Sequence, residues 1–335
     1  MDWKKGIPIA MTYCGAIVGA GFATGREVIE FFTIYGRSGL FGVVLASALL
    51  GITGVVIIDI AQRRGVYSYR GLLEEVLVNS LLVKVADGIF ALSLMVGAGV
   101  MAAAAAEILK GFVPGWLGAA LFLGGCLLIL SRGTSGFIKA NTVLVPILTL
   151  IIVAICLMEI ALPVATPLRP GPIFSAVLYV AFNSALAAVA LSSLGKVGGR
   201  ATAIIGGVGG GLLIGMMLTL VYLATAGSSQ ILPQIPLSYF AQRWLGDNAW
   251  VYDAALLAAV MTTALANLHG LASRGSSQRG YFHRCIRIAG GGWIIARLGF
   301  GTLVALLYPL LGYANLVLLG GLCYYVGSRA IRHLR

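Results

Sequence analysis

The sequence is poor in charged residues. Only 10% of its 335 residues are Asp, Glu, Lys or Arg, whereas 59% are hydrophobic. Soluble domains carry roughly 25% charged residues, so the composition excludes an ordinary soluble domain and predicts an all-α polytopic membrane protein. The formal net charge is +12. The basic residues lie between apolar segments, which is typical of topology signals and not of a nucleic-acid-binding patch.

Residues that carry metal or acid–base chemistry are also scarce. The three histidines, His269, His283 and His333, are not clustered with carboxylates, so no enzymatic activity is predicted. The five cysteines are scattered and form no C-x-x-C pair, which argues against a disulfide framework or a metal site. The start, MDWKK, runs into a long apolar segment without a small-residue cleavage pattern, so no removable signal peptide is expected.

Long apolar runs are abundant. A spanning helix needs about 20 mainly apolar residues, and this length predicts ten transmembrane helices. The predicted spans are 7–35, 39–61, 81–109, 116–130, 137–162, 173–194, 201–226, 251–271, 288–307 and 310–326. An amphipathic helix is expected within 65–79 and a structured external cap within 228–246.

Basic residues predict the orientation. If the N-terminus is internal, 17 basic residues lie on the inner side and 5 on the outer side, with Arg297 inside the ninth span. Both termini are then cytoplasmic. A proline-rich linker, 163–172, separates a first half (1–162) from a second half (173–335). Five spans in each half make the halves inverted repeats.

The first span departs most from an ordinary membrane helix. A glycine inside a helix costs about 1 kcal/mol, and charges at membrane depth are rare and usually functional. We therefore predict two half-helices, 7–18 and 25–35, joined by an unwound bend that forms part of a binding site. The segment TYCGAIVGAGFATGREVIEFF carries four glycines and three charges: Gly15, Gly19, Gly21, Gly25, Arg26, Glu27 and Glu30.

The sixth span holds the corresponding place in the second half. Its sequence, VLYVAFNSALAAVALSSLG, places Asn183 and Ser184 at mid-depth, with a second polar group at Ser192 and Ser193. Interrupted helices at corresponding positions indicate a secondary-transporter site. The sixth span is therefore predicted to be broken as well.

The paired spans, and the motif GAGFATGREVIEFF above all, resemble the LeuT-fold transporters of the amino acid, polyamine and organocation superfamily. Within that group the motif is most similar to the YkvI-like bacterial membrane proteins. The resemblance implies a 5+5 inverted repeat that works by alternating access. It also implies a sodium site between carbonyls of the first span and paired hydroxyls of the eighth. By position these ligands are Gly15, Val18, Ala259, Thr262 and Thr263.

The same resemblance implies gating and coupling residues. An arginine near Arg26 belongs to the outer gate in the family, but its acidic partner on the tenth span is not evident, and Asn315 is the nearest polar candidate. Some proton-coupled relatives use a fifth-span lysine, which here is Lys139; a snorkelling interfacial lysine is the alternative. Glu27 and Glu30 are candidates for proton or cation coupling, or for structural salt bridges.

The ends of the half-helices predict the substrate. Unpaired N–H groups around Gly21 could receive a carboxylate, and freed carbonyls near Val18 and Phe182 could receive an ammonium or Na⁺, which favours an amino acid. Two alternatives remain: the glycines could serve close helix packing, and the threonine hydroxyls could bond back to their own helix. The predicted substrate-binding residues are Ala20, Gly21, Phe22, Tyr179, Phe182, Asn183, Ser184 and Thr263.

The leading function is sodium symport of an amino acid or similar small zwitterion. Proton coupling is the close variant, and a non-transporting membrane receptor or structural subunit is the alternative of another class. The expected partners are a small-molecule substrate and the lipid bilayer, with no nucleic acid and no cofactor beyond the coupling ion, Na⁺ or H⁺.

Overall fold

The computed structural model describes residues 3–77, 79–131, 147, 149–160, 171–196, 198–226, 233–272 and 280–333. All regular secondary structure within these ranges is helical. Six of the helices are long and apolar enough to cross a membrane: Thr33–Arg64, Ser80–Ile108, Pro172–Ser192, Arg200–Ala226, Pro236–Ala272 and Phe300–Ser328. Gly115–Ser131 and Thr149–Glu159 are shorter apolar helices. The chain is a multi-pass membrane protein, as its composition predicts.

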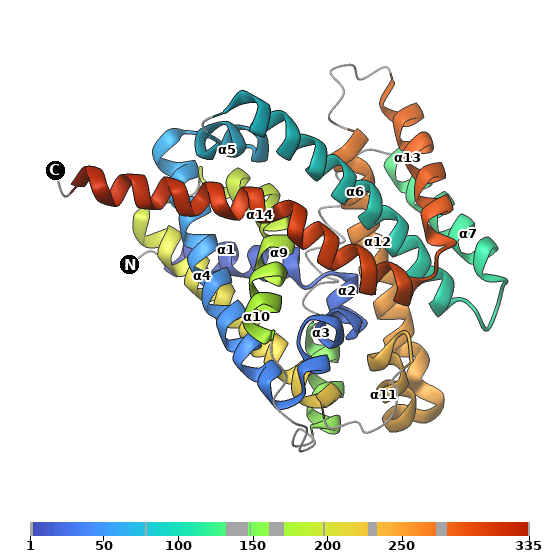
Figure 1. Cartoon of the computed structure of the whole chain (residues 1–335). Helices are drawn as coiled ribbons and strands as arrows, with labels where there is room; N and C mark the ends of the chain where they lie inside the picture. Colours follow the sequence, from blue (N-terminus) through green and yellow to red (C-terminus); the bar gives the residue numbers. More distant parts are fainter. Residues whose placement is uncertain are drawn as a thin grey trace.

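The first predicted span is interrupted twice. Helical hydrogen bonding stops at Gly19, whose N–H donates to the carbonyl of Ile17 at 2.7 Å. The second interruption is at Gly25, whose φ of 79° lies in the left-handed region that glycine adopts without steric cost. The segment consists of α1 (Trp3–Ile17), α2 (Ala20–Ala23), α3 (Arg26–Phe31) and η1 (Thr33–Ser38). Figure 1 shows α1, α2 and α3 as separate pieces.

The longer helices pack in two groups. One group surrounds α1 and the other surrounds α6, and the last helix, α14, crosses from one to the other (Figure 1). The first group adds α4 (Gly39–Arg64), α9 (Pro172–Leu194) and α10 (Arg200–Ala226) to α1. The second contains α6 (Ser80–Ile108), α7 (Gly115–Ser131), α12 (Trp250–Ala272) and α13 (Tyr281–Ala296), and α14 is Phe300–His333.

Small residues allow the closest contact, between α4 and α10. A Cβ placed on Gly211 would lie 2.5 Å from the Cα of Gly51, so the two backbones touch without a side chain between them. Close approach of this kind is a common way to pack helices in a membrane, where lipid removes the hydrophobic driving force.

Two short helices precede long ones along the chain, at the places that the sequence predicts. Helix α5 (Tyr69–Val76) begins after Ser68, whose side chain accepts a hydrogen bond from the N–H of Gly71. Helix α11 (Pro236–Leu245) covers the break in the first span. The N–H of Leu237 donates to the carbonyl of Thr24 at 3.2 Å.

The predicted break in the sixth span is wrong. Helix α9 is continuous from Pro172 to Leu194. Its interior contains no glycine or proline, and its polar side chains bond within the helix. The amide of Asn183 donates to the carbonyl of Tyr179 at 3.0 Å, and the hydroxyl of Ser184 donates to that of Val180 at 2.6 Å. Such bonds to the preceding turn satisfy buried polar groups without unwinding the backbone.

The boundary between the last two spans also differs from the prediction. Helix α13 ends at Ala296 and α14 begins at Phe300, after a turn at Gly299 with φ 83°. Arg297 is therefore not inside a span but at the C-terminal end of α13, where its guanidinium lies 5.1 Å from the ring centroid of Trp293. Half of the fifth predicted span, 137–162, lies outside the described residues, and its described part contains the short helix Thr149–Glu159.

Candidate functional site

Two carbonyls at the first interruption have no backbone partner. Within the described ranges, no hydrogen bond is found to the carbonyls of Gly15 or Val18, because the chain turns away from the helix at Gly19. The hydroxyl of Thr263, on α12, lies 3.4 Å from the position that a Cβ on Gly19 would take. The structure thus brings the threonine pair of α12 next to the unwound part of the first span.

The threonine hydroxyls of α12 also bond to their own helix. Thr262 Oγ1 donates to the carbonyl of Ala259 at 2.8 Å, and Thr263 Oγ1 donates to the same carbonyl at 3.1 Å. This is the back-bonding that the sequence left as an alternative. It uses the hydroxyl protons but leaves oxygen lone pairs that could still coordinate a cation.

Other freed carbonyls of the first span are satisfied by distant elements. The hydroxyl of Tyr252 donates to the carbonyl of Ala23 at 2.5 Å, and Leu237 of α11 bonds to Thr24. A buried carbonyl without a donor costs free energy, so these contacts stabilise the unwound backbone. The tertiary structure therefore holds the break open at defined places.

A buried carboxyl group lies at the second interruption. Glu27 of α3 is 4% exposed. A Cβ on Gly21 would lie 2.6 Å from Glu27 Oε2 and 2.8 Å from the hydroxyl of Tyr308, so both oxygens approach the backbone at a place that only glycine leaves open. Tyr179 and Asn183, both on α9, border the same carboxyl group.

Several polar atoms of this cluster lack partners. Among the described residues, Glu27 Oε1, the Tyr179 hydroxyl and Asn183 Oδ1 are buried and have no hydrogen-bond partner. No described basic side chain forms an ion pair with Glu27, since Arg26 pairs with Glu30 at 2.5 Å. A carboxylate buried without a compensating cation is strongly unfavourable.

Aromatic rings enclose the carboxyl group. Phe182 stacks on Tyr308 with ring centroids 4.5 Å apart, and Phe31 meets the edge of Tyr179 at 5.3 Å. Phe22, in α2, is fully buried. The rings exclude water from the cluster and so lower the local dielectric, which strengthens every electrostatic interaction inside it.

The remaining predicted residues are placed as follows. Arg26 and Glu30 form an i, i+4 ion pair, which is a structural salt bridge of the kind that the sequence left open for Glu30. Asn315 is 2% exposed, and neither polar atom of its amide has a partner in the part of the chain described. Lys139 and the side chain of Ala20 lie outside the described part.

Sequence reasoning missed two tyrosines of the site. Tyr308 was assigned to a loop between the predicted ninth and tenth spans, but it lies inside α14 and reaches Gly21. Tyr252 lies at the start of the predicted eighth span and bonds to Ala23. Neither pairing has a local sequence signal, because each joins segments more than 200 residues apart.

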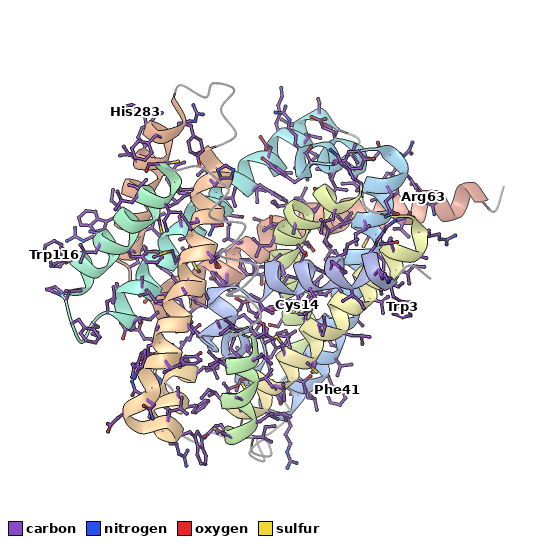
Figure 2. All side chains as sticks on the ribbon, turned by 180° about the vertical axis from the view of Figure 1, so that it is seen from behind. Trp3, Cys14, Phe41, Arg63, Trp116 and His283 are labelled. Carbon is purple, nitrogen blue, oxygen red and sulfur yellow. The ribbon has the colours of Figure 1, made fainter. Side chains whose placement is uncertain are left out.

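A separate cavity of about 270 Å³ lies between the ends of α6, α7, α13 and α14. Its lining includes Glu107, Trp116 and Arg297 and no residue of the break. In Figure 2, Trp116 lies at the edge of the molecule and Cys14 of α1 near its centre. No group of three or more His, Cys, Asp or Glu side chains that could hold a metal ion occurs in the described ranges.

No family model matches the sequence. The chain is similar to two proteins of Bacillus subtilis (strain 168). It is 29% identical over 347 residues to the uncharacterised membrane protein YkvI, covering 96% of this chain and 97% of YkvI. It is 26% identical over 351 residues to the uncharacterised protein YyaD, covering 97% and 98% of the two chains.

The fold is distantly similar to crystal structures of a manganese transporter from Eremococcus coleocola. A variant of that protein superposes with a TM-score of 0.48 at 16% identity, over 97% of this chain and 72% of the transporter. The complex with an aromatic bis-isothiourea compound gives a TM-score of 0.45 at 15% identity, with the same coverage. At this distance the likeness bears on neither substrate nor coupling ion.

Proposed function

We propose that the protein is an ion-coupled secondary transporter of the bacterial inner membrane that works by alternating access. The observation that carries this proposal is the doubly interrupted first span. Its carbonyls without a partner in the described residues and its buried Glu27 lie between α9, α12 and α14. Non-helical backbone at membrane depth is tolerated where it is buried in protein or lines a cavity, and in transporters such places are binding sites.

The packing supports two inverted five-helix halves, 1–162 and 173–335. Helices α1 and α4 come first and second in the first half, and they pack with α9 and α10, the first and second of the other half. The third and fourth spans of the two halves pack together in the same way: α6 and α7 of the first half contact α12 and α13 of the second. Ten spans with both termini cytoplasmic, as the basic residues predict, complete this proposal.

The proposed substrate is an amino acid or a similar small zwitterion. Within the described residues, no hydrogen bond is found from the N–H groups of Gly21 or Phe22, which can receive a carboxylate. The unpaired carbonyls of Gly15 and Val18 and the carboxyl group of Glu27 offer the opposite charge for an ammonium group or a cation. Both kinds of partner occur within one short segment.

The proposed coupling ion is Na⁺, bound by the carbonyls of Gly15, Val18 and Ala259 and the hydroxyls of Thr262 and Thr263. Hard cations prefer oxygen ligands of this kind. Proton coupling is the second candidate, because Glu27 is buried without a basic partner in the described residues. Lys139 is the other residue proposed for proton coupling.

The test is the thermal stability of the detergent-purified protein across an amino-acid library, in NaCl and in KCl, at two pH values. A ligand that binds the folded state raises apparent stability by mass action. We expect one class of amino acid to stabilise the protein more in NaCl, and Thr263→Ala to weaken that sodium dependence. Sodium dependence that Thr263→Ala leaves unchanged would remove the sodium assignment, and binding without uptake into liposomes would favour a receptor.

A further inference from the structure

A second group of oxygen atoms lies at Gly21 of the break, whereas Thr263 lies beside Gly19. It consists of Glu27 Oε1 on α3 and, on α9, the Tyr179 hydroxyl and Asn183 Oδ1, all buried and without a hydrogen-bond partner in the described ranges. The Tyr308 hydroxyl and Glu27 Oε2 meet at the backbone of Gly21. Three side chains from α9 and α14 therefore present oxygen atoms around the carboxyl group of Glu27.

We propose that Glu27, Tyr179, Asn183 and Tyr308 form a second cation site that takes one alkali cation, Na⁺ foremost, with the proton as its competitor. The inference deepens the proposed function and rests on it, since the bound cation would contribute to coupling. Binding of the cation itself, however, can be measured without any transported substrate.

The charge of the site favours a monovalent cation. Glu27 supplies one negative charge, and the other ligands are neutral. A monovalent cation would neutralise that charge, whereas a divalent cation would leave a net positive charge buried among aromatic rings, which is costly. An all-oxygen ligand set also suits a hard alkali ion better than a soft transition metal.

The surrounding side chains do not neutralise Glu27. The described titratable groups that face it are Tyr179 from α9 and Tyr308 from α14. On its own helix, Arg26 is held by Glu30. From the side of α10, the hydroxyl of Thr225 contacts that of Thr33 at 2.8 Å. The tyrosine and threonine hydroxyls can donate hydrogen bonds but carry no positive charge, and the charge of Arg26 is paired with Glu30. Among the described residues none therefore supplies a counter-charge to Glu27, and a cation or a proton can take that role.

The geometry links the site to the position of α3. Its ligands come from α3 on one side and from α9 and α14 on the other, so a bound cation would hold the second half-helix against both. Loss of the cation would leave an uncompensated carboxylate between them, which favours separation of α3 from α9. The site therefore couples cation occupancy to the half-helix that follows the break.

The experiment measures the stabilisation of the detergent-purified protein by NaCl, with choline chloride at equal ionic strength as the reference, at acidic, neutral and alkaline pH. For the wild type, we expect the half-saturating Na⁺ concentration to rise about tenfold for each pH unit below the point where Glu27 takes up a proton. Glu27→Gln keeps the size but removes the charge. We expect it to weaken Na⁺ binding at least about tenfold, as loss of a charged ligand does, and to abolish the pH dependence.

Two further variants keep the test independent of folding defects. Tyr179→Phe removes one oxygen but keeps the ring that packs against Phe31 and Phe32, and we expect a several-fold weaker Na⁺ affinity in a folded protein. Glu74→Gln removes one carboxylate from the exposed pair with Arg70 on α5, and it should match the wild type.

Contrary outcomes are distinct. If Glu27→Gln and Tyr179→Phe keep wild-type Na⁺ affinity while Thr263→Ala loses it, sodium binds only at α12; this inference is then overturned and the proposed transport stands. If acid alone stabilises the protein and Na⁺ has no effect, the alkali-cation site is overturned. If Na⁺ binds as expected but no amino acid binds or is taken up, the proposed transport fails and the cation site stands.

Discussion

The first span and helix α9 begin the two halves of the chain, yet only the first span is broken. The first span carries Gly19, Gly21 and Gly25 across its bend, whereas the interior of α9 has no glycine. The polar residues Asn183 and Ser184 do not unwind α9, because their side chains bond to carbonyls of the preceding turn. Polar residues at mid-helix thus indicate a site, but glycine decides whether the backbone opens there.

The two regions also satisfy their polar groups in different ways. The helix α9 does so locally, whereas the first span depends on distant residues. Tyr252 bonds to Ala23, and Ser175 of α9 bonds to the carbonyl of Phe31 at 2.6 Å. The continuous helix supports the broken one, and the candidate site forms where they meet. Four substitutions would break or sharpen this contrast.

The largest effect is expected for Gly21→Leu. A side chain here would collide with Glu27 and Tyr308, because even a Cβ would lie within 3.0 Å of both. We expect loss of amino-acid and Na⁺ binding, and overpacking that lowers the free energy of unfolding by about 1–3 kcal/mol. Ligand-induced thermal shifts would measure the loss of binding, and chemical denaturation in detergent would measure the free energy of unfolding.

The control for that substitution is Gly88→Leu on α6, where nothing lies within 4 Å of an added Cβ. This variant should bind ligands like the wild type. Ligand binding that survives Gly21→Leu would show that the glycines serve close packing instead of the proposed site.

A smaller effect, on stability alone, is expected for Tyr252→Phe. It removes the donor to the carbonyl of Ala23 and leaves a buried acceptor unpaired. We expect the free energy of unfolding to fall by about 1–3 kcal/mol. Tyr313→Phe is the matched control, since Tyr313 is 50% exposed. If the two variants are equally stable, the break does not depend on its tertiary partner.

The smallest change in stability is expected for Gly19→Ala. The nearest atom to an added Cβ is Thr263 Oγ1 at 3.4 Å, an ordinary contact, so the variant should fold. Alanine favours the helix by about 1 kcal/mol, so thermal stability should stay equal or rise slightly. Sodium-dependent ligand shifts should weaken, because a more helical backbone would pair the freed carbonyls.

The opposite substitution, alanine to glycine, tests the continuous helix α9. Ala187→Gly, at a fully buried position of α9, should cost about 1 kcal/mol and leave ligand specificity unaltered. A gain of stability on this substitution, or wild-type ligand binding by Gly19→Ala, would contradict the contrast between the two spans.

Local patterns predicted the helices better than their ends. The apolar runs identified most of the helices, and the glycines of the first span predicted its break. The predicted boundary beside Pro309 was wrong because Pro309 lies inside α14, whereas the chain turns at Gly299, with its positive φ, before α14 begins. This error assigned Tyr308 to a loop and so removed it from the predicted site.

The sequence by itself determined that this is an all-helical, multi-pass membrane protein with an interrupted first helix, because hydrophobic run length and glycine act over a few residues. Only the tertiary structure decided which oxygens meet. Glu27, Tyr179 and Tyr308 come together although more than 100 residues separate each from the next, since helix packing, and not spacing along the chain, sets which side chains share a buried space. For the same reason, α9 can remain a continuous helix while its side chains complete the candidate site at the broken first span.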